Sequence, residues 1–132
     1  MQITLYGTGS GIPSPKVGDK QLRSYAGWYT EAESDSLLFD IGVGISHKLL
    51  LDGIDILLKP THVFITHHHL DHTADLFQLM LGRCYAVRNR KVSKLHIIAP
   101  ASFINVIFEI WKIYGEEFKL EDNFEIQEAT GG

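Results

Sequence analysis

The sequence predicts an α/β (α+β) fold for one domain, and three observations support this. Short apolar segments with the pattern of strands alternate along the chain with segments in which apolar residues recur at helical spacing. The 132 residues contain 45% hydrophobic and 21% charged side chains, the composition of a soluble globular domain. Neither an internal repeat nor a linker divides the sequence. We therefore expect residues 1–132 to form a single layered domain.

The first half of the chain shows three strand patterns and one helical pattern. Residues 2–6 alternate between apolar and polar side chains and run into a turn-rich segment at residues 7–15, so we expect a strand followed by a loop. The aromatic side chains of residues 24–30 favour a second strand. Residues 37–40 have the pattern of a short buried strand, which a glycine turn and a helix to residue 53 follow.

The second half alternates more regularly between the two patterns. Within residues 61–66, Val63, Phe64 and Ile65 form a continuous apolar run, as expected of a strand covered on both faces. Helical spacing over residues 71–85 and 103–114 predicts two amphipathic helices, and residues 95–99 predict a strand between them. The last segment, residues 118–126, is typical of a strand or a hairpin.

Four histidines lie within six residues directly after the apolar run, in the order HHHLDH. In extended chain His67 and His69 project to the same side and can hold one metal ion, whereas His68 points away. Asp71 and His72 lie where the chain turns into the next helix, so they can bring a carboxylate and a third imidazole to the same place. Such ligands suit zinc, with iron or manganese as alternatives. A solvated loop without ligands is the competing interpretation.

Charge and cysteine content exclude several classes of protein. The formal net charge of −4 excludes a surface that binds polyanions throughout, so a nucleic-acid contact must be local. A single cysteine, Cys84, excludes an internal disulfide and fits a reducing compartment. The chain has no apolar run of about 18–20 residues and no signal-peptide pattern at residues 1–5. We expect a cytoplasmic protein that does not contact a membrane.

The HxHxDH pattern resembles that of the metallo-beta-lactamase superfamily. Two further segments, residues 5–13 (LYGTGSGIP) and residues 38–42 (LFDIG), are similar to ribonuclease Z and its relatives, so that the resemblance covers about residues 1–100. It implies the first half, and the start of the second, of an αββα sandwich. The remaining sheet surface would stay uncovered, so we expect either a homo-oligomer or a C-terminal half that lies outside this chain.

By the same resemblance, two zinc ions would lie between the histidines. His67 and His69 would bind the first ion and Asp71 and His72 the second, with Asp71 orienting the attacking hydroxide. Asp40, at a strand end, would hold the metal-binding loop, a role that ligand imidazoles require because their second nitrogen must be fixed. An ordinary aspartate before a glycine turn is the alternative for Asp40.

The resemblance breaks in the last third of the chain. The superfamily takes further ligands from later positions, but no histidine follows His96, and Asp122 lies in an acidic segment that does not suit a bridging ligand. Three interpretations therefore compete. In the first, the chain represents a zinc-dependent phosphodiesterase that processes RNA, such as the 3′ end of a tRNA precursor. In the second, it is a truncated or degenerate half-domain that binds metal weakly and is inactive alone. In the third, it belongs to another hydrolase, which acts on a thioester, lactam or sulfate ester.

Two other features bear on nucleic-acid binding. The glycines of residues 7–11 do not form a GxGxxG motif, because Ile12 occupies the third position and prolines follow, so they predict a turn and not a nucleotide site. Five cations without an intervening acid could hold an RNA backbone, although a solvated loop explains them equally well. These five residues are Arg83, Arg88, Arg90, Lys91 and Lys94.

Overall fold

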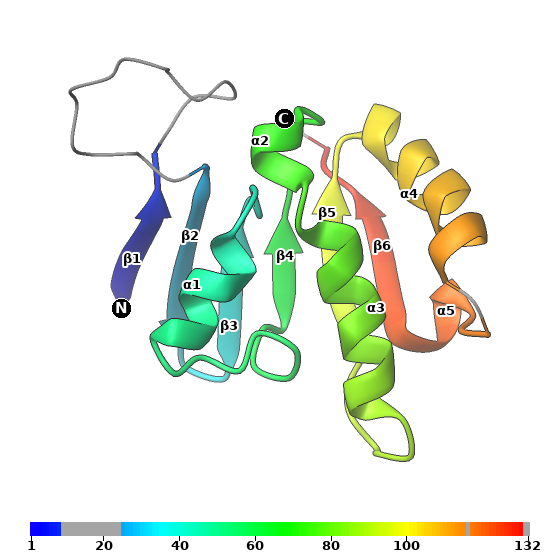
Figure 1. Ribbon diagram of the computed structural model, residues 1–132, viewed down its shortest axis with the longest axis horizontal. Helices are drawn as coiled ribbons and strands as arrows, with labels where there is room; N and C mark the ends of the chain where they lie inside the picture. Colours follow the sequence, from blue (N-terminus) through cyan, green and yellow to red (C-terminus); the bar gives the residue numbers. More distant parts are fainter. Residues whose placement is uncertain (9–24, 116, 131–132) are drawn as a thin grey trace.

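One six-stranded sheet organises the computed structural model, which describes residues 1–8, 25–115 and 117–130 (Figure 1). Its strands lie side by side in the order in which they occur in the chain. The first three pair antiparallel, and the last four pair parallel. The strands are β1 (Gln2–Gly7), β2 (Gly27–Ala32), β3 (Asp35–Phe39), β4 (His62–Phe64), β5 (Leu95–Ala99) and β6 (Phe124–Glu128).

The helices cover one face of this sheet (Figure 1). Each parallel strand is added on the same side of the preceding one, and crossover connections are right-handed, so the connecting helices must all pack on the same face. The helices are α1 (Ile45–Leu51), α2 (Leu70–Thr73), α3 (Leu76–Val87), α4 (Ala101–Tyr114) and α5 (Leu120–Asn123). No helix within the described residues is long and apolar enough to cross a membrane.

Alternation along the strands separates a buried core from an open apolar face. Leu38, Val63 and Ile97 are fully buried between the sheet and the helices. The next residue along each of these strands points to the other face of the sheet. On that face, residues paired in register on five strands form a continuous apolar row: Leu5, Trp28, Phe39, Phe64 and Ile98. Leu5 is 62% exposed and Trp28 38% exposed. The sheet therefore has the uncovered apolar face that the sequence predicts.

The helix predicted over residues 71–85 is divided into α2 and α3, so the prediction of one continuous helix was wrong. Ala74 and Asp75 separate the two helices, and the Asp75 amide donates a hydrogen bond to the carbonyl oxygen of Ile41 at 3.0 Å. The Asp75 carboxylate accepts hydrogen bonds from the backbone amide and hydroxyl of Ser46 at 3.1 and 2.6 Å. These tertiary contacts, which no local pattern contains, break the helix.

The chain end also differs in part from its prediction. The strand predicted within residues 118–126 is present as β6, but it pairs parallel to β5 and is preceded by the short helix α5, so a hairpin was the wrong alternative. The indole nitrogen of Trp111 donates to the carbonyl oxygen of Phe118 at 2.9 Å and ties this segment to α4. The turn predicted at residues 7–15 lies, from residue 9 onward, outside the described residues.

Candidate metal centre

The histidine cluster lies just beyond the carboxyl end of β4, where the chain enters α2. Parallel strands end at the same edge of a sheet, so this is where loops from neighbouring strands meet. One potential ligand atom from each of His67, His69 and Asp71 lies within 4.8 Å of the other two. The side chains of His67 and Asp71 are partly buried and that of His69 is exposed. The structure thus brings together three of the four ligands expected from the sequence.

His72 lies beside this group and faces it. Its ring centroid is 3.9 Å from that of His67, and its Nε2 is 3.2 Å from Oδ2 of Asp71. Two ligand atoms that share one tetrahedral zinc ion, each about 2.1 Å from it, are about 3.4 Å apart. Asp71 and His72 therefore have the separation that a common ion requires.

Asp40 connects the cluster to the strand next to β4. This carboxylate is 4% exposed, and it accepts hydrogen bonds from the Thr66 amide and the Thr66 hydroxyl, each at 2.8 Å. Its Oδ2 is also 2.7 Å from Nδ1 of His72. Asp40 has a φ of 57°, a left-handed conformation that aspartate tolerates better than most residues. The buried charge is thus satisfied by residues on both sides of the histidine loop.

These contacts determine which ring nitrogen of two histidines is engaged. Asp40 can only accept, so Nδ1 of His72 must donate to it, and Nε2 is the ring nitrogen that faces Asp71. The Thr66 hydroxyl donates to Asp40, so it accepts from Nδ1 of His67 at 3.0 Å. In both rings Nδ1 is thus engaged, and Nε2 is the nitrogen that is available to a metal. Desolvation, and then the neighbouring His72 and His69, lower the pKa of His67 and favour its neutral form.

Gly42 allows the loop after β3 to approach the metal-binding loop. A Cβ atom at this position would overlap the backbone carbonyl oxygen of Asp71 and lie 2.7 Å from Cβ of Tyr25. Next to Gly42, the Ile41 amide donates to the carbonyl oxygen of His72 at 2.7 Å, and from the segment before β2 the Ala26 amide donates to that of Asp71 at 3.2 Å. The LFDIG motif therefore supplies a carboxylate and a close backbone approach.

Arg83 corrects one sequence prediction. It was one of the five cations that could hold an RNA backbone, but it is 5% exposed, and its guanidinium donates to the carbonyl oxygens of Leu57 at 2.8 Å, Ser93 at 3.0 Å and Pro60 at 3.5 Å. Burial lowers its pKa. The position of Arg83 on the inner face of α3 removes it from any nucleic-acid surface, because its donors already hold two loops to the helix.

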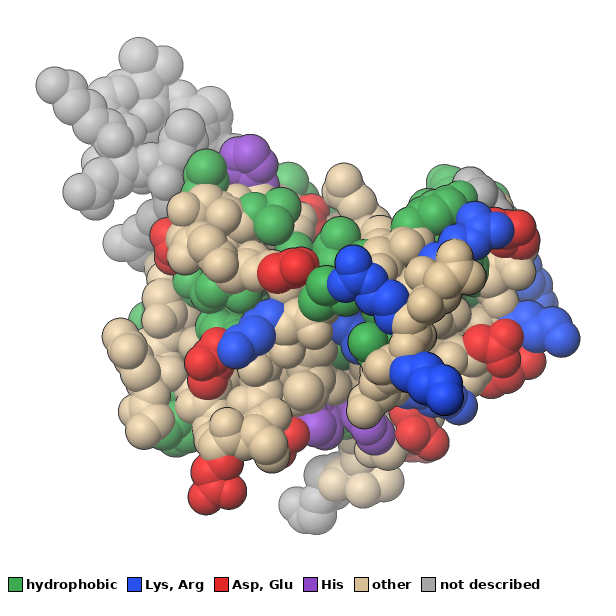
Figure 2. Space-filling model, turned by 90° about the horizontal axis from the view of Figure 1, so that it is seen from below, with side chains coloured by type: hydrophobic (Ala, Val, Ile, Leu, Met, Phe, Trp, Pro, Cys, Tyr) green, Lys and Arg blue, Asp and Glu red, His purple; other side chains and the backbone are tan. Residues whose placement is uncertain are grey.

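The other four predicted cations lie at the edge of the sheet opposite the histidines. Arg88, Arg90, Lys91 and Lys94 are exposed in the connection between α3 and β5, at the end of α3 far from α2 (Figure 1). Figure 2, which looks at the molecule from below, shows Lys and Arg side chains gathered on this underside. Arg88 pairs with Glu117 at 2.9 Å and lies over the ring of Phe118. These cations therefore do not border the histidine cluster.

Thr66 is the residue of the site that sequence reasoning missed. A threonine at the end of an apolar strand does not by itself predict a functional role. The role of the Thr66 hydroxyl depends on its contacts with Asp40 on one side and His67 on the other. His62 and His96 stack on the open face of the sheet, with ring centroids 4.7 Å apart.

Comparison with known protein families adds an independent line of observation. Residues 1–128 match the family model described as Anti-Pycsar protein Apyc1. Among curated proteins, ribonuclease Z of Staphylococcus epidermidis is 36% identical over 108 residues, which are 81% of this chain and 33% of that protein. The chain thus spans about a third of the length of the curated relatives it matches.

Solved structures of low sequence identity share the fold. The short form of human tRNase Z superimposes with a TM-score of 0.72 at 23% identity, covering 99% of this chain and 46% of that chain. Zinc-bound PqqB of Methylobacterium extorquens has a TM-score of 0.66 at 12% identity, with 98% of this chain and 46% of that chain covered. The mixed sheet therefore corresponds to about half of such a fold, and the three-residue group is of the HxHxD kind typical of its zinc enzymes.

Proposed function

This chain belongs to the family of the Anti-Pycsar protein Apyc1, within the metallo-beta-lactamase superfamily, and on that basis we propose that it forms the metal-binding part of a phosphodiester hydrolase. The observation that carries the proposal is the convergence of His67, His69 and Asp71 to within 4.8 Å, with His72 facing them. His67 and His69 would hold one zinc ion, and Asp71 and His72 would hold the second. Iron or manganese fits the same donors.

Bound zinc supplies Lewis-acid polarisation of the phosphate and a water of lowered pKa. The chain's own residues prepare the site for this chemistry. Asp40 engages Nδ1 of His72 directly and Nδ1 of His67 through the Thr66 hydroxyl, which leaves the Nε2 atoms of both rings as the available ligands. The carboxylate of Asp71 is partly buried beside His72 and can accept a hydrogen bond from the attacking water, which orients the water toward phosphorus.

An RNA phosphodiester is the substrate that we propose for this site. Support comes from the ribonuclease Z relatives, which are 36% identical over most of the chain, and from the four exposed cations beyond α3. Those cations lie at the opposite edge of the sheet, so they act as a separate contact for the RNA backbone and not on the scissile phosphate. A tRNA precursor has a backbone long enough to reach both edges.

The test couples zinc affinity to hydrolysis in matched variants. Zinc affinity is measured by competition with a chelator, and hydrolysis is measured with bis(p-nitrophenyl) phosphate and with a labelled tRNA precursor. His67→Ala and Asp71→Ala remove ligands, so each is expected to lower zinc affinity by more than the ~100-fold that loss of an outer partner costs, and to abolish turnover. His68→Ala leaves zinc affinity unchanged, and His47→Ala, an exposed histidine on α1, leaves both unchanged.

Three outcomes separate the interpretations. Equal zinc affinities in all four variants would contradict the ligand assignment. Turnover of bis(p-nitrophenyl) phosphate without cleavage of the tRNA precursor would support the phosphodiesterase and overturn the RNA substrate. Turnover of thioester, lactam or sulfate-ester substrates in place of phosphodiesters would identify a different hydrolase.

A metal-binding unit that needs a further protein segment is the second candidate function. The described residues contain one group of three metal-binding side chains, and no histidine follows His96 in these 132 residues. A second copy of the chain, or sequence beyond it, would then supply the remaining ligands. Zinc binding without turnover, followed by turnover when that segment is added, would support this candidate.

A further inference from the structure

A row of three possible metal ligands crosses the open face of the sheet, on three parallel strands. His62 of β4 pairs in register with His96 of β5, which pairs in register with Glu125 of β6. Neighbouring strands lie about 4.8 Å apart, and residues that pair in register project to the same face. Two imidazoles and one carboxylate therefore stand side by side, near the edge of the sheet opposite the histidine cluster.

The two imidazoles of this row are already neighbours, and they are accessible. Their ring centroids are 4.7 Å apart, with an angle of 18° between the ring planes. His62 and His96 are partly buried, and Glu125 is exposed. Histidine side chains also reach the surface in the view of the molecule from below (Figure 2). A metal ion can therefore reach the row from solvent without a rearrangement of the strands.

Thr61 engages one ring nitrogen of His62 as Thr66 engages one of His67. The Thr61 hydroxyl lies 2.8 Å from Nδ1 of His62 and accepts a hydrogen bond from the Ser36 amide at 3.0 Å. The Thr66 hydroxyl lies 3.0 Å from Nδ1 of His67. In each case the threonine directly precedes the histidine, and Nε2 is the ring nitrogen that is available to a metal. An oriented imidazole thus lies at each end of β4.

From this row we infer that His62, His96 and Glu125 form a second metal site, which takes one divalent transition-metal ion. Two imidazoles and a carboxylate suit Zn²⁺, and the same donors bind Cu²⁺ more tightly. Among the described residues only the group around His67 has three ligand atoms within 4.8 Å of one another, so the side chains of the row must turn toward a common point. The strand spacing of about 4.8 Å leaves an ion above His96 within reach of both outer side chains.

The ion would join the last strand of the sheet to the strands beside it. In the described sheet β6 is the final strand and pairs with β5. A ligand that binds the folded chain and not the unfolded chain stabilises the fold, and the effect grows with its concentration. The second site is therefore structural, linking β4, β5 and β6, and it does not rest on the proposed hydrolase activity.

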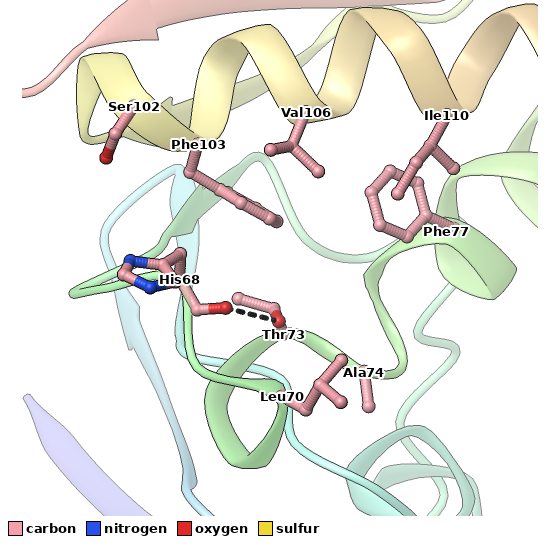
Figure 3. Close-up of a pocket in the computed structure, with 9 residues that line it drawn as sticks. All are labelled: His68, Leu70, Thr73, Ala74, Phe77, Ser102, Phe103, Val106 and Ile110. Atoms are coloured by element: carbon pink, nitrogen blue, oxygen red, sulfur yellow. Dashed lines mark hydrogen bonds between the residues drawn. The ribbon is translucent and has the colours of Figure 1, made fainter.

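The test removes the candidate metal centre so that the second site is measured by itself. His67→Ala combined with His69→Ala leaves Asp71 and His72 together in that loop, whereas His68 lines the cavity beside α4 (Figure 3). This double variant is titrated with Zn²⁺ and with Cu²⁺ in equilibrium dialysis. We expect one ion per chain, and the electron paramagnetic resonance spectrum of the Cu²⁺ form should show coupling to two imidazole nitrogens.

Matched substitutions in the double variant assign the ion to the row. His62→Phe and His96→Phe keep an aromatic ring in the stack but remove a ligand, so each should lower Zn²⁺ affinity by more than about tenfold. Glu125→Gln removes the carboxylate charge and should lower it several-fold. Glu128→Gln, at an exposed carboxylate of the same strand, and His47→Phe, at an exposed histidine of α1, should leave Zn²⁺ affinity unchanged.

Two further measurements protect the test against misfolding. Zn²⁺ should raise the melting temperature of the double variant, and without metal the His62→Phe and His96→Phe chains should melt within a few degrees of it. Thr61→Val keeps all three ligands but removes the hydroxyl that engages Nδ1 of His62, so Zn²⁺ affinity should fall by about tenfold. Thr61→Ser retains the hydroxyl and should restore it.

Unchanged Zn²⁺ affinity in both phenylalanine variants of the row would overturn the inference. An equal loss in His47→Phe, or a melting temperature of the double variant that does not respond to Zn²⁺, would also overturn it. The outcome for the proposed function is separate. If the wild-type chain hydrolyses no phosphodiester but the double variant binds one ion through His62 and His96, only the proposed function is wrong.

Discussion

Two buried charges, Asp40 and Arg83, lie toward opposite edges of the sheet and each make three hydrogen bonds, but to partners of different kinds. At the carboxyl edge, Asp40 accepts from the amide and hydroxyl of Thr66 and from Nδ1 of His72. On the side of the opposite edge, Arg83 donates to the carbonyl oxygens of Leu57, Pro60 and Ser93. A buried charge must be satisfied in both places. Only Asp40 transmits its orientation to side chains that can bind a metal.

This difference indicates which edge can carry chemistry. A charge that holds backbone carbonyls fixes the course of loops but leaves no reactive group in a defined protonation state. A charge that holds imidazoles fixes both their orientation and their proton. We therefore expect substitution of Arg83 to affect folding alone and substitution of Asp40 to affect metal binding more than folding.

The largest expected effect is that of Arg83→Met on stability. The apolar side chain keeps much of the packing against α3 but leaves three carbonyl oxygens, one buried and two part-buried, without the guanidinium donor, so the free energy of unfolding should fall by about 3 kcal/mol. Zinc affinity per folded molecule should not change. Urea unfolding monitored by circular dichroism measures the first quantity, and competition with a chelator measures the second.

Arg90→Met provides the control, because Arg90 is exposed in the loop after α3 and should tolerate the same change within about 0.5 kcal/mol. A loss of zinc affinity in Arg83→Met that matches the loss in a ligand variant would show that the two edges are coupled, and the distinction between them would fail.

Asp40→Asn should have the next largest effect, and on metal binding. Asparagine keeps the size of the side chain and tolerates the left-handed φ, but it replaces one acceptor oxygen by a donor. Either His72 or Thr66 then loses its partner, so zinc affinity should fall by about 10- to 100-fold while the free energy of unfolding changes by about 1 kcal/mol. Chelator competition and urea unfolding are again the measurements.

Asp35→Asn is the matched control for this substitution, because Asp35 is an exposed carboxylate at the other end of the same strand, β3. Its zinc affinity should equal that of the wild-type chain. If Asp40→Asn also retained wild-type zinc affinity, the proposed control of the imidazole tautomers by Asp40 would be incorrect.

The smallest effect concerns the cations of the opposite edge. Arg88→Glu combined with Arg90→Glu should weaken RNA binding several-fold at low salt, and the slope of log affinity against log salt should become shallower by about 2 if each arginine contacts one phosphate. Filter binding at several salt concentrations measures both. Lys59→Glu combined with Lys112→Glu makes the same charge change at two exposed, ion-paired lysines elsewhere. Identical losses of RNA affinity in the two double variants would show that the basic loop contributes to RNA binding only through its net charge.

Local patterns were sufficient for much of the fold. Residues 95–99 were predicted as a strand and form β5, and the predicted helix over residues 103–114 is present in α4, because each element shows one unbroken period over its whole length. The division of residues 71–85 between α2 and α3 was not predictable, since it depends on a hydrogen bond that Asp75 donates to Ile41 and on two that it accepts from Ser46. A helical period in the sequence indicates which face of a helix is apolar. It does not indicate where contacts with a distant loop interrupt the helix.

The sequence by itself determined the position of the candidate metal centre. The HxHxD spacing after an apolar strand places two imidazoles on one side of an extended chain, and this geometry depends on the local backbone alone. Only the tertiary structure decided the rest: that Asp40 and Thr66 orient His67 and His72, that Arg83 lies in the interior, and that the exposed cations occupy the opposite edge. These depend on which strands become neighbours, a property of long-range packing that no short segment encodes.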